Sequence, residues 1–293
     1  MNAATPRENK PALAVFVMAI AILMFTMIDT SAKWLILSGL PALQVVFARY
    51  AGAFVTALLV FIPKGGLGQF RTNSPKIQLL RALALLGSTI FNFFALSYLP
   101  ITLTIAIFFA MPIVITLLSI PVLGEKVGIR RFLAVVVGFL GVLVVVQPWG
   151  AGFHWAIFLS IGALCSASGY FVLTRLLAGR DNNSTSQLWA SGVATFCLLP
   201  FAFQDWFWPD SWVGLFVFVF IGIIGGVSHI LATLAHRLAD ASTLAPVVYA
   251  QVFYATALGY LVFRTLPTFW TAAGAAIIIA SGVYIWQRER IRN

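Results

Sequence analysis

The sequence predicts an all-α, polytopic membrane protein with ten transmembrane helices. Its composition, 61% hydrophobic and 9% charged, leaves too little polar surface to cover a water-soluble domain. Apolar stretches of about 20 residues, the length that crosses a bilayer core, recur from end to end. Because lipid offers no partner to an unpaired backbone amide, each single span is expected to be a helix.

The expected helices follow one another with short loops between them. Prolines such as Pro41, Pro63 and Pro209 mark several of these loops. The first apolar stretch is too long for the apolar region of a signal peptide and lacks a small-residue cleavage site, so we expect no cleavable leader. The expected spans are 12–36, 42–62, 77–98, 101–121, 131–147, 154–178, 185–203, 211–235, 242–263 and 268–287.

The cations predict the orientation in the membrane. Of the 18 lysines and arginines, three stand apart: Lys33 and Arg264 on one side, and Arg49 inside the second span. The other side collects Arg7, Lys10, Lys64, Arg71, Lys76, Arg81, Lys126, Arg130, Arg131, Arg175, Arg180, Arg237, Arg288, Arg290 and Arg292. Because cationic loops stay in the cytoplasm, we expect both termini there, in a multi-pass protein of a bacterial-type inner membrane. A net charge of +10 spread over short loops argues against a nucleic-acid partner.

The two halves of the chain show a weak internal similarity. The segment Leu96–Thr102 corresponds to His236–Ser242, 140 positions later. Each half is expected to hold five helices, and an odd number places the second half upside down relative to the first. We therefore expect one transmembrane domain, 1–293, built from inverted repeats at about 1–148 and 149–293, as in many alternating-access transporters.

Two short motifs resemble those of a known family. Leu123-Gly124-Glu125-Lys126, followed by the glycine-spotted segment Gly138–Val142, resembles the motif that closes the fourth helix of EamA-type proteins in the drug/metabolite transporter superfamily. Leu96–Pro100 is similar to the family's link between helices three and four. The resemblance covers essentially the full length, although Arg264-Thr265 stands where the family often repeats Gly-Glu.

Within the superfamily the chain looks most like the YddG-type exporters of aromatic and other neutral amino acids. The resemblance implies a basket-like bundle with a central cavity lined by the first, third, fourth, sixth, eighth and ninth helices.

Ionisable residues inside a span are costly, and they are therefore functional candidates. Asp29 and Lys33 lie four positions apart on one face of the first expected helix, and Arg49 lies at a similar depth on the second. We expect a network of these three side chains that braces the two helices toward the outer side. Its role is either structural, as an ion pair, or functional, as a gate or a clamp for a substrate carboxylate through Arg49.

Polar and aromatic residues near the middle of the spans are the candidates for a substrate cavity. His229 is either a proton-coupling group or a hydrogen-bonded packing residue. Asn92 and Gln251 suit a zwitterion, although an interhelical hydrogen bond is the alternative. Pro112 removes a helix hydrogen bond and is expected to kink the fourth helix. The expected cavity residues are Phe91, Asn92, Phe94, Tyr98, Phe108, Met111, Pro112, Ser168, Tyr170, His229, Tyr249, Gln251 and Tyr254.

Small residues four positions apart, such as Gly222 and Gly226, predict close helix packing within the chain. A serine–histidine hydrolase built on Ser168 and His229 lacks the glycine-flanked nucleophile of known hydrolases. The sequence also lacks a metal-ligand cluster and a phosphate-binding glycine loop.

The sequence therefore favours a secondary carrier over an enzyme. We expect it to export small neutral metabolites, above all aromatic or neutral amino acids, by alternating access around a central cavity. We expect no metal and no cofactor, with a small-molecule substrate and the bilayer as partners, and a monomer or a homodimer. The alternatives are export of other metabolites or drugs, such as nucleosides, sugars and amphipathic compounds, or a non-transporting membrane scaffold.

Overall fold

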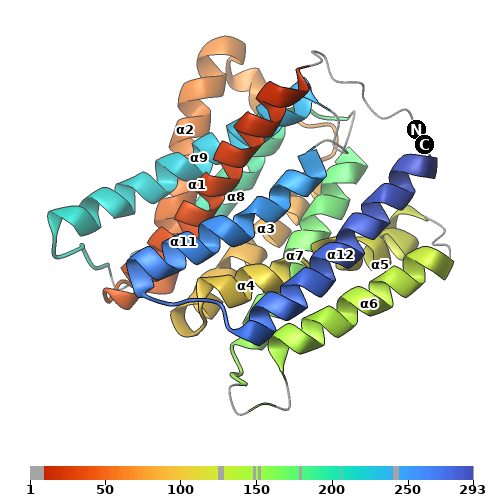
Figure 1. Cartoon of the computed structure of the whole chain (residues 1–293). Helices are drawn as coiled ribbons and strands as arrows, with labels where there is room; N and C mark the ends of the chain where they lie inside the picture. Colours follow the sequence, from red (N-terminus) through yellow and green to blue (C-terminus); the bar gives the residue numbers. More distant parts are fainter. Residues whose placement is uncertain are drawn as a thin grey trace.

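The chain folds into a bundle of helices, shown in Figure 1 as a computed structural model. The structure describes residues 10–124, 129–147, 150, 153–177, 180–204, 206–239 and 244–292. Every regular element in these ranges is an α-helix or a 3₁₀-helix, which confirms the all-α fold. The elements are α1 (Pro11–Leu37), α2 (Ala42–Gly65), η1 (Leu67–Phe70), α3 (Pro75–Tyr98), α4 (Ile101–Phe108), α5 (Met111–Leu123), α6 (Ile129–Val146), α7 (Ile157–Leu177), α8 (Asn183–Ala202), α9 (Trp212–Leu238), η2 (Ala245–Ala250), α11 (Gln251–Phe263) and α12 (Phe269–Arg292).

The length and hydropathy of the helices confirm a polytopic membrane protein. Six segments of the described chain are long and apolar enough to cross a bilayer, and shorter apolar helices cover Leu133–Val146, Val247–Phe263 and Phe269–Tyr284. The helix α8 is in neither group because it begins with the polar run 183–187. The six long segments are Pro11–Leu37, Ala42–Pro63, Pro75–Tyr98, Ile101–Val122, Ile157–Leu177 and Trp212–Leu238.

The expected span over 101–121 is present as Ile101–Val122, but it is divided into two helices. A turn at 109–110 separates α4 from α5, and Pro112 stands in the first turn of α5. Since proline carries no amide hydrogen, it cannot donate to the carbonyl of Phe108 four residues earlier. The regular α-helical hydrogen bonding is therefore interrupted just before Pro112.

The expected helix over 242–263, described from residue 244 onward, is also not α-helical throughout. A 3₁₀ segment, η2, holds Pro246 in its first turn and passes into α11 at Gln251. The fourth and ninth apolar stretches, which occupy corresponding positions in the two halves, are therefore both discontinuous. Such paired interruptions are typical of the binding region of secondary transporters.

Helices from the two halves of the chain pack against one another. The helix α1 lies along α9, α3 along α7, and α6 along α12, while α2 contacts both α8 and α9 (Figure 1). The α2–α9 crossing is very close, because Gly222 and Gly226 of α9 face Gly52 and Thr56 of α2. Small residues at this spacing let two backbones approach.

A polar network joins two loops at the end of the bundle where α1 begins. Asp181, between α7 and α8, accepts hydrogen bonds from the Thr72 hydroxyl at 2.5 Å, the Asn73 amide at 3.0 Å and the Gln78 side chain at 2.9 Å. Partial burial raises the pKa of Asp181, but these three donors outweigh it, and the pKa lies below its ordinary value of 3.8. The Trp189 indole adds a bond of 3.0 Å to the Phe70 carbonyl. The network fixes the start of α3 to the start of α8.

Candidate substrate cavity

A cavity of about 560 Å³ lies among the helices of both halves. One wall comes from α1, α9, η2 and α11, and the facing wall from α3, α7 and α8, while α2, α4 and α5 complete it. Its volume is in the range of pockets that hold drug-sized ligands, about 300–1,000 Å³. The resemblance implied a cavity lined by the first, third, fourth, sixth, eighth and ninth apolar stretches. The structure adds Arg49 from the second and Asn183, Ser186 and Gln187 from the seventh.

The cavity reaches the end of the bundle at which α1 begins. Its lining there includes Asn183, at the start of α8, and His236, at the end of α9, and both residues are exposed. Toward the opposite end, Leu96, Leu99 and Ile101 are buried and lie outside the lining of the cavity. The cavity is therefore one-sided in this structure.

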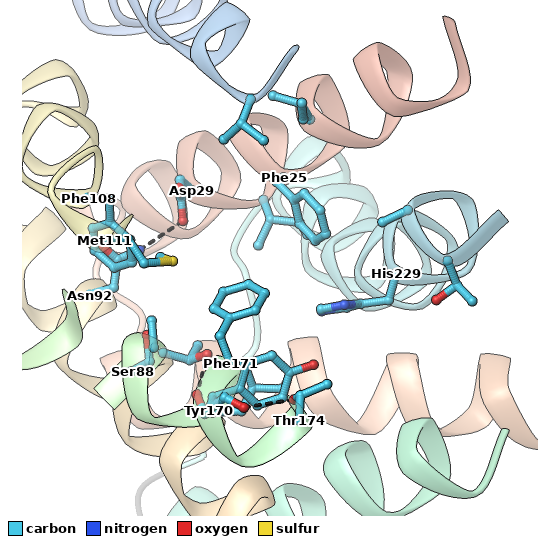
Figure 2. A pocket seen from close by; sticks show the side chains of 18 of the residues that line it. Phe25, Asp29, Ser88, Asn92, Phe108, Met111, Tyr170, Phe171, Thr174 and His229 are labelled. Carbon is cyan, nitrogen blue, oxygen red and sulfur yellow. Dashed lines mark hydrogen bonds between the residues drawn. The ribbon is translucent and has the colours of Figure 1, made fainter. Parts of the chain in front are cut away.

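Within the described chain, the side-chain hydrogen bonds of Asp29, Lys33 and Arg49 run to α3 and its C-terminal end, and not from one of the three to another. Asp29 accepts a hydrogen bond of 2.9 Å from the Asn92 side chain, as Figure 2 shows. The Lys33 ammonium donates to the carbonyls of Leu96 at 2.8 Å and Leu99 at 2.6 Å. These carbonyls lie at the end of α3, where a helix presents unpaired acceptors and partial negative charge. Lys33 therefore supplies hydrogen-bond donors to the carbonyls at the end of α3 and does not pair with Asp29.

Arg49 also contacts α3. One of its terminal nitrogens lies 3.2 Å from the Thr89 hydroxyl, and its guanidinium lies 4.6 Å from the centre of the Tyr50 ring. The ionisable residues expected to join the first two helices are therefore each anchored on the third. Asp29 and Arg49 line the cavity, whereas Lys33 lies beyond its closed end.

Arg81 stands in the wall formed by α3, α7 and α8, and each of its side-chain nitrogens donates a hydrogen bond. Its Nε donates to the Thr174 hydroxyl at 2.7 Å, and its terminal nitrogens donate to the Ser186 carbonyl at 3.1 Å and the Tyr170 hydroxyl at 2.8 Å. The guanidinium also lies 4.5 Å from the centre of the Tyr170 ring. This arginine ties α3 to α7 and α8 and shapes the wall of the cavity.

Aromatic side chains surround the open space. Phe25 of α1 meets the His229 ring of α9 edge-on at 5.0 Å between ring centres. Figure 2 shows Phe25, Phe171 and His229 projecting toward one another across the cavity, with Phe108 and Met111 near Asn92. Such a lining, apolar with a few placed polar groups, suits a planar, partly polar molecule.

Six of the expected cavity residues line this space: Asn92, Phe108, Met111, Tyr170, His229 and Gln251. Seven others lie outside its lining. On α3, Phe91 and Phe94 are exposed, and Tyr98 stacks on His154 with ring centres 5.4 Å apart. These three side chains lie outside the cavity because they are on other sides of α3 than Asn92, which faces the cavity.

The remaining four of these residues pack within the bundle. Ser168 is fully buried and donates to the Leu164 carbonyl at 2.8 Å, so it is not placed as a nucleophile for His229. Pro112 lies in the first turn of α5, and Tyr249 meets Phe109 edge-on with ring centres 5.5 Å apart. Tyr254 packs against the apolar cluster between α1 and α9.

Several cavity residues were missed from the sequence. Phe25 lies one turn before Asp29 on α1, Ser88 and Thr89 lie one turn before Asn92 on α3, and Phe171 follows Tyr170. Helical spacing from a polar residue already singled out would have indicated the first three. Nothing in the sequence distinguished Phe171 from lipid-facing phenylalanines.

Two features of the sequence fall outside the described residues: Glu125-Lys126 of the Gly-Glu motif, and residues 240–242 of the repeat. Within the described ranges, histidine, cysteine, aspartate and glutamate form no cluster of three or more that could hold a metal.

Comparisons with known proteins give the chain a family and a fold. The EamA-like transporter family matches residues 12–147 and 154–286. A protein named riboflavin transporter, from Vibrio cholerae serotype O1, is 30% identical over 98% of this chain and 97% of its own length. An S-adenosylmethionine uptake transporter of Rickettsia prowazekii is 26% identical over 86% of this chain and 85% of its own. A protein of known crystal structure matches 97% of this chain and 99% of its own with a TM-score of 0.62 at 16% identity, which shows the fold alone.

Proposed function

Because the chain belongs to the EamA-like transporter family of the drug/metabolite transporter superfamily, we propose that it is a secondary carrier for a small organic metabolite. The membership confirms the resemblance drawn from the Leu123–Lys126 and Leu96–Pro100 motifs. The cavity carries the proposal, because it has the volume of a small-molecule site and its walls come from both halves of the chain. The carrier does no chemistry on its substrate and requires neither cofactor nor metal.

Alternating access between inverted repeats, about 1–148 and 149–293, is the mechanism we propose. Exchange of the two halves maps α1 onto α7 and α9 onto α3, so the α1–α9 pair becomes the α7–α3 pair, and both pairs are in contact. The α6–α12 and α2–α8 pairs map onto themselves. This pattern and the paired interruptions before Met111 and Gln251 support two pseudo-symmetric units around one site.

The proposed orientation places both termini in the cytoplasm of a bacterial-type inner membrane. It is supported by the gathering of cations at the end of the bundle where α1 begins. The cavity then opens to the cytoplasm, and its closed end at Lys33 faces outward. A monomer or a homodimer is compatible with this arrangement.

Riboflavin is the first substrate to test, because the riboflavin transporter similar to this chain matches it over nearly the whole length. Aromatic residues on three walls, Phe25, Phe108 and Phe171, suit a flat ring system. Export of aromatic or neutral amino acids is the second candidate. The observation that favours it is the presence of opposite charges, Asp29 and Arg49, in one cavity, which suits a zwitterion.

The decisive experiment is flux in proteoliposomes that hold the purified protein. Labelled riboflavin, tryptophan, threonine and S-adenosylmethionine are compared, with and without a pH gradient. Saturable flux that excess unlabelled substrate blocks is expected, and the substrate that gives it decides between the two candidates. A response to the gradient would support His229 as a coupling group. Absence of flux for every compound, from protein shown to be folded, would discard both substrates.

A further inference from the structure

The two arginines that line the cavity differ in how far their nitrogens are satisfied. Each nitrogen of Arg81 donates to a group of the protein, and the side chain is 4% exposed. Arg49 is 8% exposed, yet one terminal nitrogen alone has a partner, Thr89. Its Nε is buried and has no hydrogen-bond partner among the described residues. Arg49 thus retains donors that the protein does not use.

The carboxylate of Asp29 attracts Arg49 through space, but no hydrogen bond joins the two side chains in the described ranges. Asp29 lies in the same cavity but bonds to Asn92, and no ion pair joins it to Arg49 in the described ranges. A guanidinium stays charged at any physiological pH. A buried charge whose donors are unfilled is unfavourable, and an arriving acceptor removes that penalty.

The surroundings hold Arg49 in place for an incoming group. Its guanidinium lies over the Tyr50 ring, and the Thr89 hydroxyl is fixed by Tyr50 at 2.7 Å and by the Leu85 carbonyl at 3.1 Å. A guanidinium fixed in this way presents its remaining N–H groups in a planar fork, which matches paired oxygen acceptors.

We propose that Arg49 is the residue that binds an oxygen-acceptor group of the transported molecule, a carboxylate or a ring carbonyl, and that Arg81 is a structural residue of the wall. The proposal rests on the proposed carrier function and adds the chemistry of one end of its substrate. It also assigns different roles to Arg49 and to Arg81, which the sequence placed only among the cytoplasmic cations.

Ligand binding to the purified full-length protein tests the proposal with two pairs of compounds. Tryptophan and tryptamine differ in the carboxylate. Riboflavin and a phenazine share a three-ring plane, but the phenazine lacks the ring carbonyls. The variants are Arg49→Gln and Arg49→Lys, with Arg71→Gln as the control because Arg71 is exposed and outside the cavity.

Arg49→Gln is expected to weaken binding of the acceptor-bearing member about 10-fold or more and to leave the other member unchanged. The affinity of Arg49→Lys is expected to lie between those of the wild type and Arg49→Gln, since lysine keeps the positive charge but lacks the planar fork of N–H groups. The pair that responds identifies the source of the acceptor. Equal weakening of both members, or of neither, overturns the proposal. A second result would also overturn the proposal: an Asp29→Asn variant whose affinity for every ligand changes as it does in Arg49→Gln. That result would mean that Arg49 acts with Asp29 in a gate and does not bind the ligand.

Thermal denaturation of the ligand-free protein gives a readout that needs no substrate. Removal of an unsatisfied buried charge by Arg49→Gln is expected to leave the melting temperature unchanged or to raise it. Arg81→Gln is expected to lower it, because three bound donors are lost. A fall for Arg49→Gln as large as that for Arg81→Gln overturns the proposal. If no tested substrate binds but the melting temperatures change as expected, the outcome would instead count against the proposed function.

Discussion

Gly52 of α2 and Gly222 of α9 stand back to back: a Cβ placed on Gly52 would lie 2.5 Å from the Cα of Gly222, and one placed on Gly222 would lie 2.6 Å from the Cα of Gly52. Both neighbours are backbone atoms, so no side chain can swing aside. Gly222→Ala is therefore expected to push the helices apart and to destabilise the protein by about 1–3 kcal/mol. Thermal denaturation in detergent measures the effect.

The control is Gly68→Ala in η1, where an added Cβ meets nothing within 4 Å. A Gly222→Ala protein as stable as this control would mean that α2 and α9 can separate at no cost.

Asp181 predicts a pH-dependent contribution to stability. Its folded-state pKa lies below the ordinary value of 3.8, so the carboxylate stabilises the fold above that pH, and the contribution is lost as the pH falls through the folded-state pKa. Asp181→Asn is expected to cost about 1 kcal/mol at neutral pH, a small value because the group is partly exposed. Melting temperatures of the two proteins across the pH range should converge in acid.

Asp210→Asn is the matched control, since Asp210 is exposed. A gap between wild type and Asp181→Asn that stayed constant down to about pH 3 would show that the charge has no part in the network.

Lys33 is expected to hold the closed end of the cavity. It joins α1 to the last carbonyls of α3, and its ammonium also lies 5.5 Å from the centre of the Phe263 ring at the end of α11. Lys33→Met leaves the Leu96 and Leu99 carbonyls without this donor, and a loss of about 1–3 kcal/mol is expected. Hydrogen exchange at the end of α3 should rise more than in Lys76→Met, a change at an exposed lysine. Equal exchange in both variants would contradict the role given to Lys33.

The orientation can be tested with single cysteines. Cys165 and Cys197 are free and exposed, so both are first replaced by serine. Asp210→Cys, before α9, is expected to react with a membrane-impermeant maleimide in intact cells, whereas Lys76→Cys, at the start of α3, should react only after permeabilisation. The reverse pattern would place the termini and the mouth of the cavity on the outer side.

Helix existence was readable from the sequence because a bilayer imposes length and polarity on every span. Pro112 indicated a disturbance in the fourth stretch, but proline alone does not say whether a helix bends or breaks. The partners of Lys33 were not readable, since they are backbone carbonyls of α3 and any helix end offers the same groups. Of the six expected residues that line the cavity, all but Met111 are polar or aromatic side chains within a span. Those outside its lining, such as Phe94 and Tyr98, share that character but lie on other faces of their helices.

The hydrogen bonds of Arg81 and Asp181 have a consequence for motion. They join α3, α7 and α8 into one group of helices. A backbone hydrogen bond of 3.0 Å from the Lys10 amide to the Leu238 carbonyl and a shared apolar cluster join α1 and α9 into a second group. The mouth of the cavity lies between these two groups of helices, and α2 contacts α8 of the first group and α9 of the second. When the mouth narrows, the α3–α7–α8 group and the α1–α9 group are therefore expected to move toward each other about α2. The distance between two spin labels should change when the labels are in different groups and stay constant when both are in the same group.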